Sequence, residues 1–258
     1  MHVSVPKLIG TTRTALRHVV DFCYPGKCSF CEAPCEGDVP LCEPCRIDLH
    51  ALEVAPACAH CAKPVADHDA PCPYCKGKGL RPLETIVRLS VFDDPVKHLI
   101  HQIKYHRGWP LAEFLADRLL DQDRVTRLLA QTDVLVPVPL YPLRQILRGY
   151  NQAEVIARRL VKKSESRLRL MGPAVRLKNT ESQTHLSPTK REENLRDAFG
   201  ISHPKSVRGK RVVLVDDVTT TGATLVSLAR ELSRAEPVSI SAITIAIADP
   251  KGRGFEQV

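Results

Sequence analysis

The chain has 258 residues, long enough for one full-sized domain and one smaller one. Hydrophobic residues make up 43% and charged residues 26%, as in soluble globular proteins, and no segment approaches the roughly 18 uncharged apolar residues that a membrane helix needs. The formal net charge of +8 favours an anionic ligand or partner, but a phosphate-rich small molecule and a nucleic acid fit this charge equally well.

The N-terminal segment has basic residues but no apolar core like that of a secretory signal. We therefore expect a cytoplasmic protein. Leu16, Val19, Val20 and Phe22 are spaced to form one face of a short helix. Without an export signal, the ten cysteines of the chain favour metal or redox use over a disulfide framework.

Eight of the ten cysteines form four Cys-x-x-Cys pairs, and the last two pairs repeat the first two at a constant offset of 30 residues. This pattern indicates an internal duplication of one four-cysteine unit. Each pair can aim two thiolates at one cation, and two pairs complete a tetrahedral site for zinc. We predict two structural zinc sites in a double zinc ribbon. The simplest ligand sets are Cys28, Cys31, Cys42 and Cys45 in the first and Cys58, Cys61, Cys72 and Cys75 in the second.

The spacing leaves some points open. An interleaved pairing of the Cys-x-x-Cys units also fits it, and an iron–sulfur cluster also takes four thiolates, although two equal units favour zinc. Cys23 and Cys35 fall outside the repeat, and we expect them to be structural thiols. The ribbons fit structural, nucleic-acid-binding and protein-docking roles, of which a structural or docking role is our default.

The cysteine-rich region ends near Gly79, which predicts one domain over residues 1–80 and a second over residues 81–258. Long apolar segments without cysteine follow. The elements expected there are a strand over Ile86–Phe92, a helix over Val96–Tyr105 with Ile100 and Ile103 inward, a longer helix over Leu111–Leu129 and a buried strand over Val134–Val138.

A proline-rich turn follows that strand, and Gly149 permits a tight turn before a predicted helix over Ala153–Val161. We place Arg144 and Arg148 in the loop before the helix, at the carboxyl end of a strand. Guanidinium groups in that position suit pyrophosphate, because arginine offers bidentate geometry. Lys104 is a weaker candidate for the same role. The remaining basic residues here, expected to form a solvated helix face, are Arg158, Arg159, Lys162 and Lys163.

A third strand, predicted over Ala174–Leu177, precedes a polar segment that is almost free of large apolar residues. Because this segment sits between two predicted core strands, we expect a lid over Thr180–Asn194 rather than a disordered linker. Gln183 and Arg191 are its candidate ligand-binding residues. The chain rejoins the core at Ala198, Phe199 and Ile201, and a further strand is expected over Val238–Ala248.

The most informative stretch is residues 212–224, Val-Val-Leu-Val-Asp-Asp-Val-Thr-Thr-Thr-Gly-Ala-Thr. Its first four residues predict a strand buried on both faces, as in the parallel sheet of an α/β fold. Asp216 and Asp217 then lie at the carboxyl end of the strand, where such sheets place their ligands. The loop that follows opens a helix, and its free amides suit a phosphate. The candidate phosphate-binding residues are Val218, Thr219, Thr220, Thr221, Gly222, Ala223 and Thr224.

Carboxylates beside a phosphate site repel the phosphate itself but accept hydrogen bonds from sugar hydroxyls, so this stretch fits a ribose 5-phosphate. A buried strand before an ordinary polar turn, or the acidic pair of a receiver-type domain, is the alternative interpretation. Neither alternative requires Thr-Thr-Thr-Gly-Ala-Thr directly after the carboxylates.

The stretch resembles the phosphoribosyl-pyrophosphate signature of type I phosphoribosyltransferases over thirteen contiguous positions. Together with Val-Pro-Val-Pro-Leu at residues 136–140 and Arg-Gly-Tyr-Asn-Gln at residues 148–152, it resembles ComF-type competence proteins over about residues 20–248. Tyr150 is a mild departure, since phenylalanine is common there.

The resemblance implies a type I phosphoribosyltransferase fold, a mostly parallel sheet flanked by helices, preceded by a small double zinc ribbon. It implies binding of phosphoribosyl pyrophosphate with Mg²⁺, a phosphoribosyltransferase activity on a nitrogen acceptor, and a role in natural transformation. Asp216 and Asp217 are the expected catalytic residues. The partners implied are single-stranded DNA, a competence helicase and a recombination mediator.

A non-catalytic adaptor is the alternative function, with the zinc ribbons and a basic face binding DNA or a protein partner. Stacking aromatic residues are expected in a site for single-stranded DNA, and aromatic residues make up only 5% of this chain.

Overall fold

The computed structural model describes residues 26–35, 39–66, 71–164, 167–178 and 197–248. The chain divides into two compact units, Met1–Asp48 and Leu49–Val258. The second set of four cysteines therefore lies in the same compact unit as the sheet. The domain boundary after residue 80 stays a prediction. The predicted N-terminal helix falls outside the described residues. No helix within the described residues has the length and apolar character needed to cross a membrane.

The described part of the first unit contains a short hairpin and the beginning of a helix. β1 (Gly26–Lys27) pairs with β2 (Pro34–Cys35) in an antiparallel manner. The segment between these strands carries the first Cys-x-x-Cys pair. Helix α2 (Glu43–Val54) begins in this unit and continues into the second.

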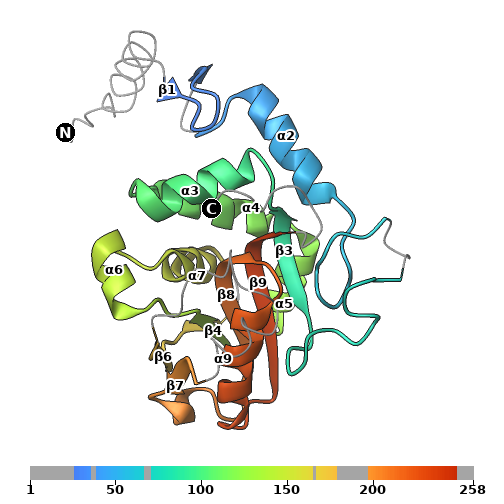
Figure 1. Cartoon of the computed structure of the whole chain (residues 1–258), viewed down its shortest axis with the longest axis vertical. Helices are drawn as coiled ribbons and strands as arrows, with labels where there is room; N and C mark the ends of the chain where they lie inside the picture. Colours follow the sequence, from blue (N-terminus) through green and yellow to red (C-terminus); the bar gives the residue numbers. More distant parts are fainter. Residues whose placement is uncertain (1–25, 36–38, 67–70, 165–166, 179–196, 249–258) are drawn as a thin grey trace, which may run out of the picture. The chain divides into compact units, whose positions relative to one another are not determined.

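The second unit is built on a five-stranded parallel sheet with the strand order β3-β9-β8-β4-β5. Figure 1 shows the first four of these strands side by side. Each pair of neighbouring strands runs parallel. The two longest strands are almost entirely buried and rich in Val, Ile, Leu and Ala, as expected for a sheet covered on both faces. The predicted α/β class is confirmed. The strands are β3 (Ile86–Val91), β4 (Val134–Pro137), β5 (Arg169–Leu170), β8 (Arg211–Thr219) and β9 (Ser239–Ile247).

Helix α9 (Ala223–Ser233) covers one face of this sheet. Val212 and Leu214 of β8 share a core cluster with the buried side of α9. The inward residues of α9 are those predicted from helical spacing, Leu225, Leu228, Ala229 and Leu232. Burial of this stripe, rather than intrinsic helix propensity, stabilises an eleven-residue helix.

Helix α7 (Gln152–Lys163) covers the other face, toward which Val213 and Val215 point because successive side chains of a strand alternate. Helices α4 (Trp109–Leu120) and α7 pack together, and α3 (Val96–Tyr105) packs on α4. The bounds of α3 and its inward residues agree with the prediction.

Arg159 joins α7 to α4 through two hydrogen bonds to Asp117, with Nη2 to Oδ2 at 2.6 Å. This contact corrects the expectation that Arg159 lies on a solvated face. Arg158 does lie on that face, and it pairs with Glu154 one turn away.

The region predicted as one helix over Leu111–Leu129 is two helices, α4 and α5 (Asp123–Ala130). The helical conformation is interrupted at Gln122, whose backbone is extended. The side-chain amide of Gln122 donates to the Leu89 carbonyl of β3 at 2.9 Å. The apolar spacing continues across the break, so the pattern alone did not reveal it.

The predicted third strand is β6 (Ala174–Arg176), but it pairs antiparallel with β7 (Phe199–Ile201) in a separate two-stranded sheet. A short 3-10 helix, η2 (Pro204–Ser206), follows β7. Ala198 and Phe199 are buried in the core, as predicted. The predicted lid over Thr180–Asn194, with Gln183 and Arg191, lies outside the described residues.

Arg144 and Arg148 lie on a short helix, α6 (Pro142–Arg148), rather than in the predicted loop. Proline in the first helical turn needs no backbone hydrogen bond there, and Gly149, with φ of 83°, ends the helix in the left-handed conformation. Asn151 then begins α7, since its side-chain oxygen accepts from the Ala153 amide.

Asn151 has a second role, because its amide donates to the carbonyl of Val138 at 3.0 Å and so ties α7 to the end of β4. We expect Asn151→Ala to lower the free energy of unfolding by about 2 kcal/mol, since it removes a helix cap and leaves a buried carbonyl unpaired. Urea unfolding measures this effect. Arg158→Ala, which removes only an exposed ion pair, should cost about 0.5 kcal/mol or less. Equal losses in the two variants would contradict the role given to Asn151.

Candidate functional site

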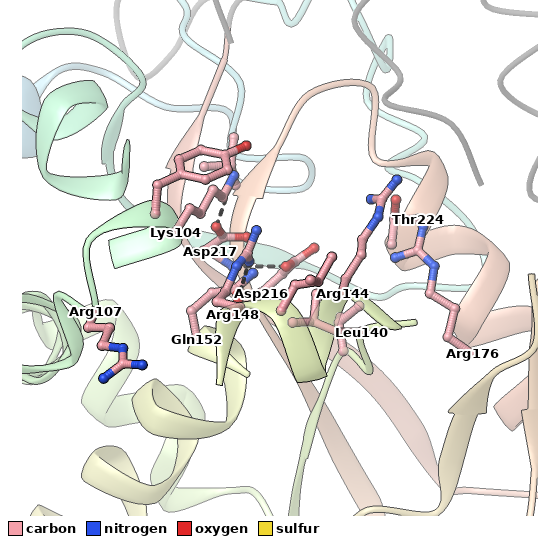
Figure 2. A pocket seen from close by; sticks show the side chains of 14 residues that line it. Lys104, Arg107, Leu140, Arg144, Arg148, Gln152, Arg176, Asp216, Asp217 and Thr224 are labelled. Carbon is pink, nitrogen blue, oxygen red and sulfur yellow. Dashed lines mark hydrogen bonds and ion pairs between the residues drawn. The ribbon is translucent and has the colours of Figure 1, made fainter. Parts of the chain in front are cut away.

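A cleft of about 540 Å³ lies at the carboxyl ends of β4 and β8, between α3, α6 and the start of α9 (Figure 2). This is the edge of the sheet at which parallel α/β folds bind ligands. Basic and acidic side chains from separate parts of the sequence meet here. The lining residues are Lys104, Tyr105, Arg107, Val138, Leu140, Arg144, Leu147, Arg148, Gln152, Arg176, Asp216, Asp217, Val218 and Thr224.

The two carboxylates sit inside β8, which runs four residues beyond the predicted strand Val212–Val215. Alternation along the strand sends Asp216 toward the face covered by α9 and Asp217 toward the face of α3 and α7. Figure 2 shows the result: Asp217 points to Lys104, while Asp216 lies nearer Arg144 and Thr224. One ligand in the cleft can therefore contact both carboxyl groups.

Lys104 forms an ion pair with Asp217, with Nζ 3.1 Å from Oδ2, and both side chains are largely buried. Burial acts to raise the pKa of Asp217, but the Lys104 ammonium outweighs this effect and the pKa lies below its usual value. Asp217 is thus ionised at neutral pH.

Asp216 has the opposite electrostatic environment. Burial raises the pKa of this carboxyl well above its usual value, and the adjacent charge of Asp217 adds to the rise. One Asp216 oxygen accepts from the Asp217 amide at 2.9 Å. The pKa values of the two neighbouring carboxyl groups are therefore shifted in opposite directions, downward for Asp217 and upward for Asp216.

The segment after the carboxylates forms a tight turn into α9. Thr219 ends β8, Gly222 has φ of 84°, and α9 begins at Ala223. The Ala223 amide is 3.3 Å from the Thr221 hydroxyl, and Thr224 lines the cleft. The first amides of a helix and its positive dipole end favour a bound anion. Of the predicted phosphate-binding residues, Val218 and Thr224 line the cleft that holds both carboxyl groups.

The arginines come from two sides. Figure 2 shows Arg144 of α6 and Arg176 of β6 near Thr224, and Arg148 near Asp217, whereas Arg107 points away from the carboxylates. Arg148 donates to Gln152 at 2.6 Å, and its guanidinium lies 5.8 Å from the centre of the Tyr105 ring.

Sequence reasoning missed Arg176. Its position within a predicted strand gave no sign that it faces a ligand cleft. Burial there lowers the pKa of Arg176, and the nearby positive charge of Arg144 acts in the same direction. The predicted candidates Gln183 and Arg191 lie outside the described residues.

Tyr150 adds a contact that phenylalanine cannot make. Its hydroxyl donates to the backbone carbonyl of Ile103 in α3, next to Lys104. This bond ties the turn between α6 and α7 to the helix that carries the ammonium.

The cysteines group as the sequential assignment predicts, with the four sulfurs of each set within 4.8 Å of one another. In the first set, Cys31 Sγ is 3.5 Å from both Cys42 Sγ and Cys45 Sγ. Four sulfurs around one zinc at about 2.3 Å are about 3.8 Å apart, so the donor set fits Zn²⁺. In the second set, the Sγ separations are 3.6 Å for Cys58–Cys75 and for Cys61–Cys72. Cys35 is buried and outside both sets, and Cys23 lies outside the described residues.

Comparison with known proteins agrees with this architecture. The phosphoribosyl transferase domain family matches residues 106–257. The chain is 32% identical over 220 residues to DNA utilization protein YhgH of Salmonella typhimurium, covering 81% of this chain and 92% of that protein. It is 32% identical over 199 residues to competence protein F of Haemophilus influenzae, covering 75% and 84%.

A solved hypoxanthine phosphoribosyltransferase from Staphylococcus aureus overlaps at 15% identity with a TM-score of 0.32, over 57% of this chain and 68% of that one. That overlap is too low to add to the fold assignment, which stands on the parallel sheet and on the family match. With two four-cysteine clusters ahead of a phosphoribosyltransferase domain, the chain belongs to the ComF family of competence-type proteins.

Proposed function

We propose that the chain binds phosphoribosyl pyrophosphate together with Mg²⁺. The observation that carries this proposal is the meeting, in one cleft, of two adjacent carboxyl groups, the start of helix α9 and three arginines. The ribose 5-phosphate would lie on the amides of residues 220–224. The ribose hydroxyls would bond to Asp216 and Asp217.

The charge balance of the cleft supports a ligand richer in negative charge than a simple sugar phosphate. Arg144, Arg148 and Arg176 line it beside Lys104, which Asp217 already neutralises. Three guanidinium groups in a partly enclosed cleft suit pyrophosphate, whose oxygens they can bind in bidentate fashion. Mg²⁺ prefers oxygen ligands, which the pyrophosphate and the ionised Asp217 offer, and the cation would neutralise part of the charge of the pyrophosphate.

We infer that the activity is transfer of the phosphoribosyl group to a nitrogen acceptor. The lone pair of the acceptor nitrogen forms the new bond at C1 of the sugar, and pyrophosphate leaves with the electron pair of the bond that breaks. Arginines that bind the leaving group and the ionised Asp217 near the cationic ring both act where charge develops in the transition state. Val138 and Leu140 give one side of the cleft an apolar lining.

A role in competence follows from the relatives. Competence protein F and the DNA utilization proteins share most of their length with this chain. We propose that this protein acts in the uptake or use of DNA. Single-stranded DNA, a competence helicase and a recombination mediator remain the partners implied by family resemblance.

Calorimetric titration with phosphoribosyl pyrophosphate and Mg²⁺ tests the binding site. The zinc-loaded parent should bind with a micromolar Kd, and Asp216→Asn combined with Asp217→Asn should abolish detectable binding, because the hydroxyls lose their charged acceptor. Asp121→Asn, at an exposed position on the end of α4, is the control and should bind like the parent. Absence of binding by a folded parent would overturn the proposal and leave the adaptor function as the better account.

Lys104→Met tests the electrostatic role of the ion pair. In the parent, the folded pKa of Asp217 lies below its unfolded value, so Asp217 stabilises the fold above the unfolded pKa of about 3.9 and loses this contribution as the pH falls through the folded pKa. Without the ammonium, burial raises the folded pKa instead, and the ionised form is destabilising.

We expect Lys104→Met to lower the free energy of unfolding by about 3 kcal/mol at pH 7 and by progressively less toward about pH 4, as Asp217 takes up a proton. Urea unfolding across this pH range measures the difference. When Asp217→Asn is added to Lys104→Met, the loss in the free energy of unfolding relative to the parent should no longer shrink toward pH 4 because of Asp217 in the variant. A difference between parent and Lys104→Met that does not change with pH would contradict the electrostatic role.

Metal analysis tests the cysteine sites. The purified chain should contain two zinc ions, and Cys31→Ser or Cys61→Ser should each reduce the content to about one, because three thiolates hold the metal less tightly. Mass spectrometry of the metal content distinguishes the outcomes. Iron in place of zinc, or an unchanged content in either variant, would refute the assignment.

A further inference from the structure

Leu80 lies between the second cysteine cluster and the core of the sheet. Its partly buried side chain packs against the cluster of Cys58, Cys61, Cys72 and Cys75. The same side chain packs against the core cluster that contains the inward residues of α9. Leu80 follows the Cys72–Cys75 pair by five residues, and its carbonyl accepts from the Leu83 amide at 3.0 Å, which closes a turn before β3.

The backbone around this cluster is joined to the beginning of β3. The Ile86 amide donates to the His60 carbonyl at 2.9 Å, and the Thr85 hydroxyl donates to the Ala59 carbonyl at 2.8 Å. Ala62, directly after Cys61, is buried in the same core cluster as α9. The second four-cysteine unit is therefore part of the framework of the sheet, and its geometry fixes where Leu80 is held.

Leu80 also contacts the phosphate-binding loop at its most constrained residue. A Cβ atom added at Gly222 would lie 2.4 Å from Cδ1 of Leu80. Gly222 has φ of 84° and is the residue from which α9 starts. The backbone of the loop thus approaches Leu80 so closely that a methyl group does not fit between them without a shift of the leucine.

We propose that Leu80 is a positioning residue for sugar-phosphate binding, through which the second four-cysteine site supports the loop at residues 220–224. This inference rests on the proposed function, because it assumes that the loop holds a phosphate. A loop whose amides are held in place before binding loses less conformational freedom when the anion arrives. Because coupling between two sites is reciprocal, bound sugar phosphate should in turn stabilise metal in the second cluster.

The contacts of Leu80 indicate a matched pair of variants. Leu80→Ala removes the side chain that touches both the cysteine cluster and the loop. Val65 packs against the cysteine cluster but is not among the residues packed on the core of α9, so Val65→Ala is the control. Leu80→Met approximately preserves the side-chain volume and should keep the contacts with both the cysteine cluster and the loop.

The experiment uses full-length, zinc-loaded protein and titrates phosphoribosyl pyrophosphate by calorimetry. Leu80→Ala should raise the Kd at least about five-fold with zinc content unchanged, whereas Val65→Ala and Leu80→Met should stay within about two-fold of the parent. Saturating ligand should also slow the release of zinc to a chelator in the parent but not in Leu80→Ala. Equal Kd values for Leu80→Ala and Val65→Ala would overturn the inference. So would a rate of zinc release from the parent that is the same with and without the ligand.

Hydrogen exchange of the loop amides separates this inference from the proposed function. Leu80→Ala should speed exchange at residues 220–226 relative to Val65→Ala, with no ligand present. If the parent binds no phosphoribosyl pyrophosphate, the proposed function fails, and the exchange result still decides whether Leu80 supports the loop. Unchanged exchange in Leu80→Ala refutes that support whatever the titration shows.

Discussion

The alternation of side chains along β8 is the constraint on which the site depends. Two adjacent aspartates at the end of a buried strand must point to opposite faces of the sheet, so they meet different surroundings. Asp217 finds Lys104 of α3 at 3.1 Å and keeps its charge. Asp216 forms no comparable ion pair among the described residues, and burial together with the charge of Asp217 raises its pKa. The opposite pKa shifts of these two neighbouring aspartates thus come from the fold, since the side chains themselves are identical.

Other parts of the fold keep this arrangement in place. Tyr150 ties the turn between α6 and α7 to α3, and Asn151 ties α7 to the end of β4. Both residues belong to Arg-Gly-Tyr-Asn-Gln, which also contributes Arg148 to the cleft. This short motif therefore begins α7, joins it to α3 and to the end of β4, and contributes a positive charge to the cleft. On the other side, Leu80 packs against both the second four-cysteine cluster and the core beside α9, next to Gly222, so this cluster is part of the framework of the sheet.

Much of the fold was predictable because its signals are local. The apolar run before Asp216 predicts a buried strand, and the spacing of Leu225, Leu228 and Leu232 predicts the covered side of α9. The cysteine repeat predicts both clusters, because each pair already has the spacing of metal ligands. What failed depends on tertiary contacts. The break at Gln122 relies on a hydrogen bond to β3, and α6 is too short and too exposed for its periodicity to stand out.

The same distinction applies to the site. Asp216, Asp217 and the loop after them are contiguous, so the sequence alone placed them together. Arg176 reaches the cleft through a separate hairpin, and Lys104 reaches Asp217 from a helix more than a hundred residues earlier. No spacing rule connects such residues, because only the packing of α3 and β6 around the sheet brings them to one edge.

The most direct measurement is a crystal structure of the protein with phosphoribosyl pyrophosphate and Mg²⁺. The account predicts the 5-phosphate on the amides of residues 220–224, the ribose hydroxyls within hydrogen-bonding distance of Asp216 and Asp217, and pyrophosphate among Arg144, Arg148 and Arg176. A ligand bound elsewhere, or one that enters this cleft without contacting either aspartate, would contradict it.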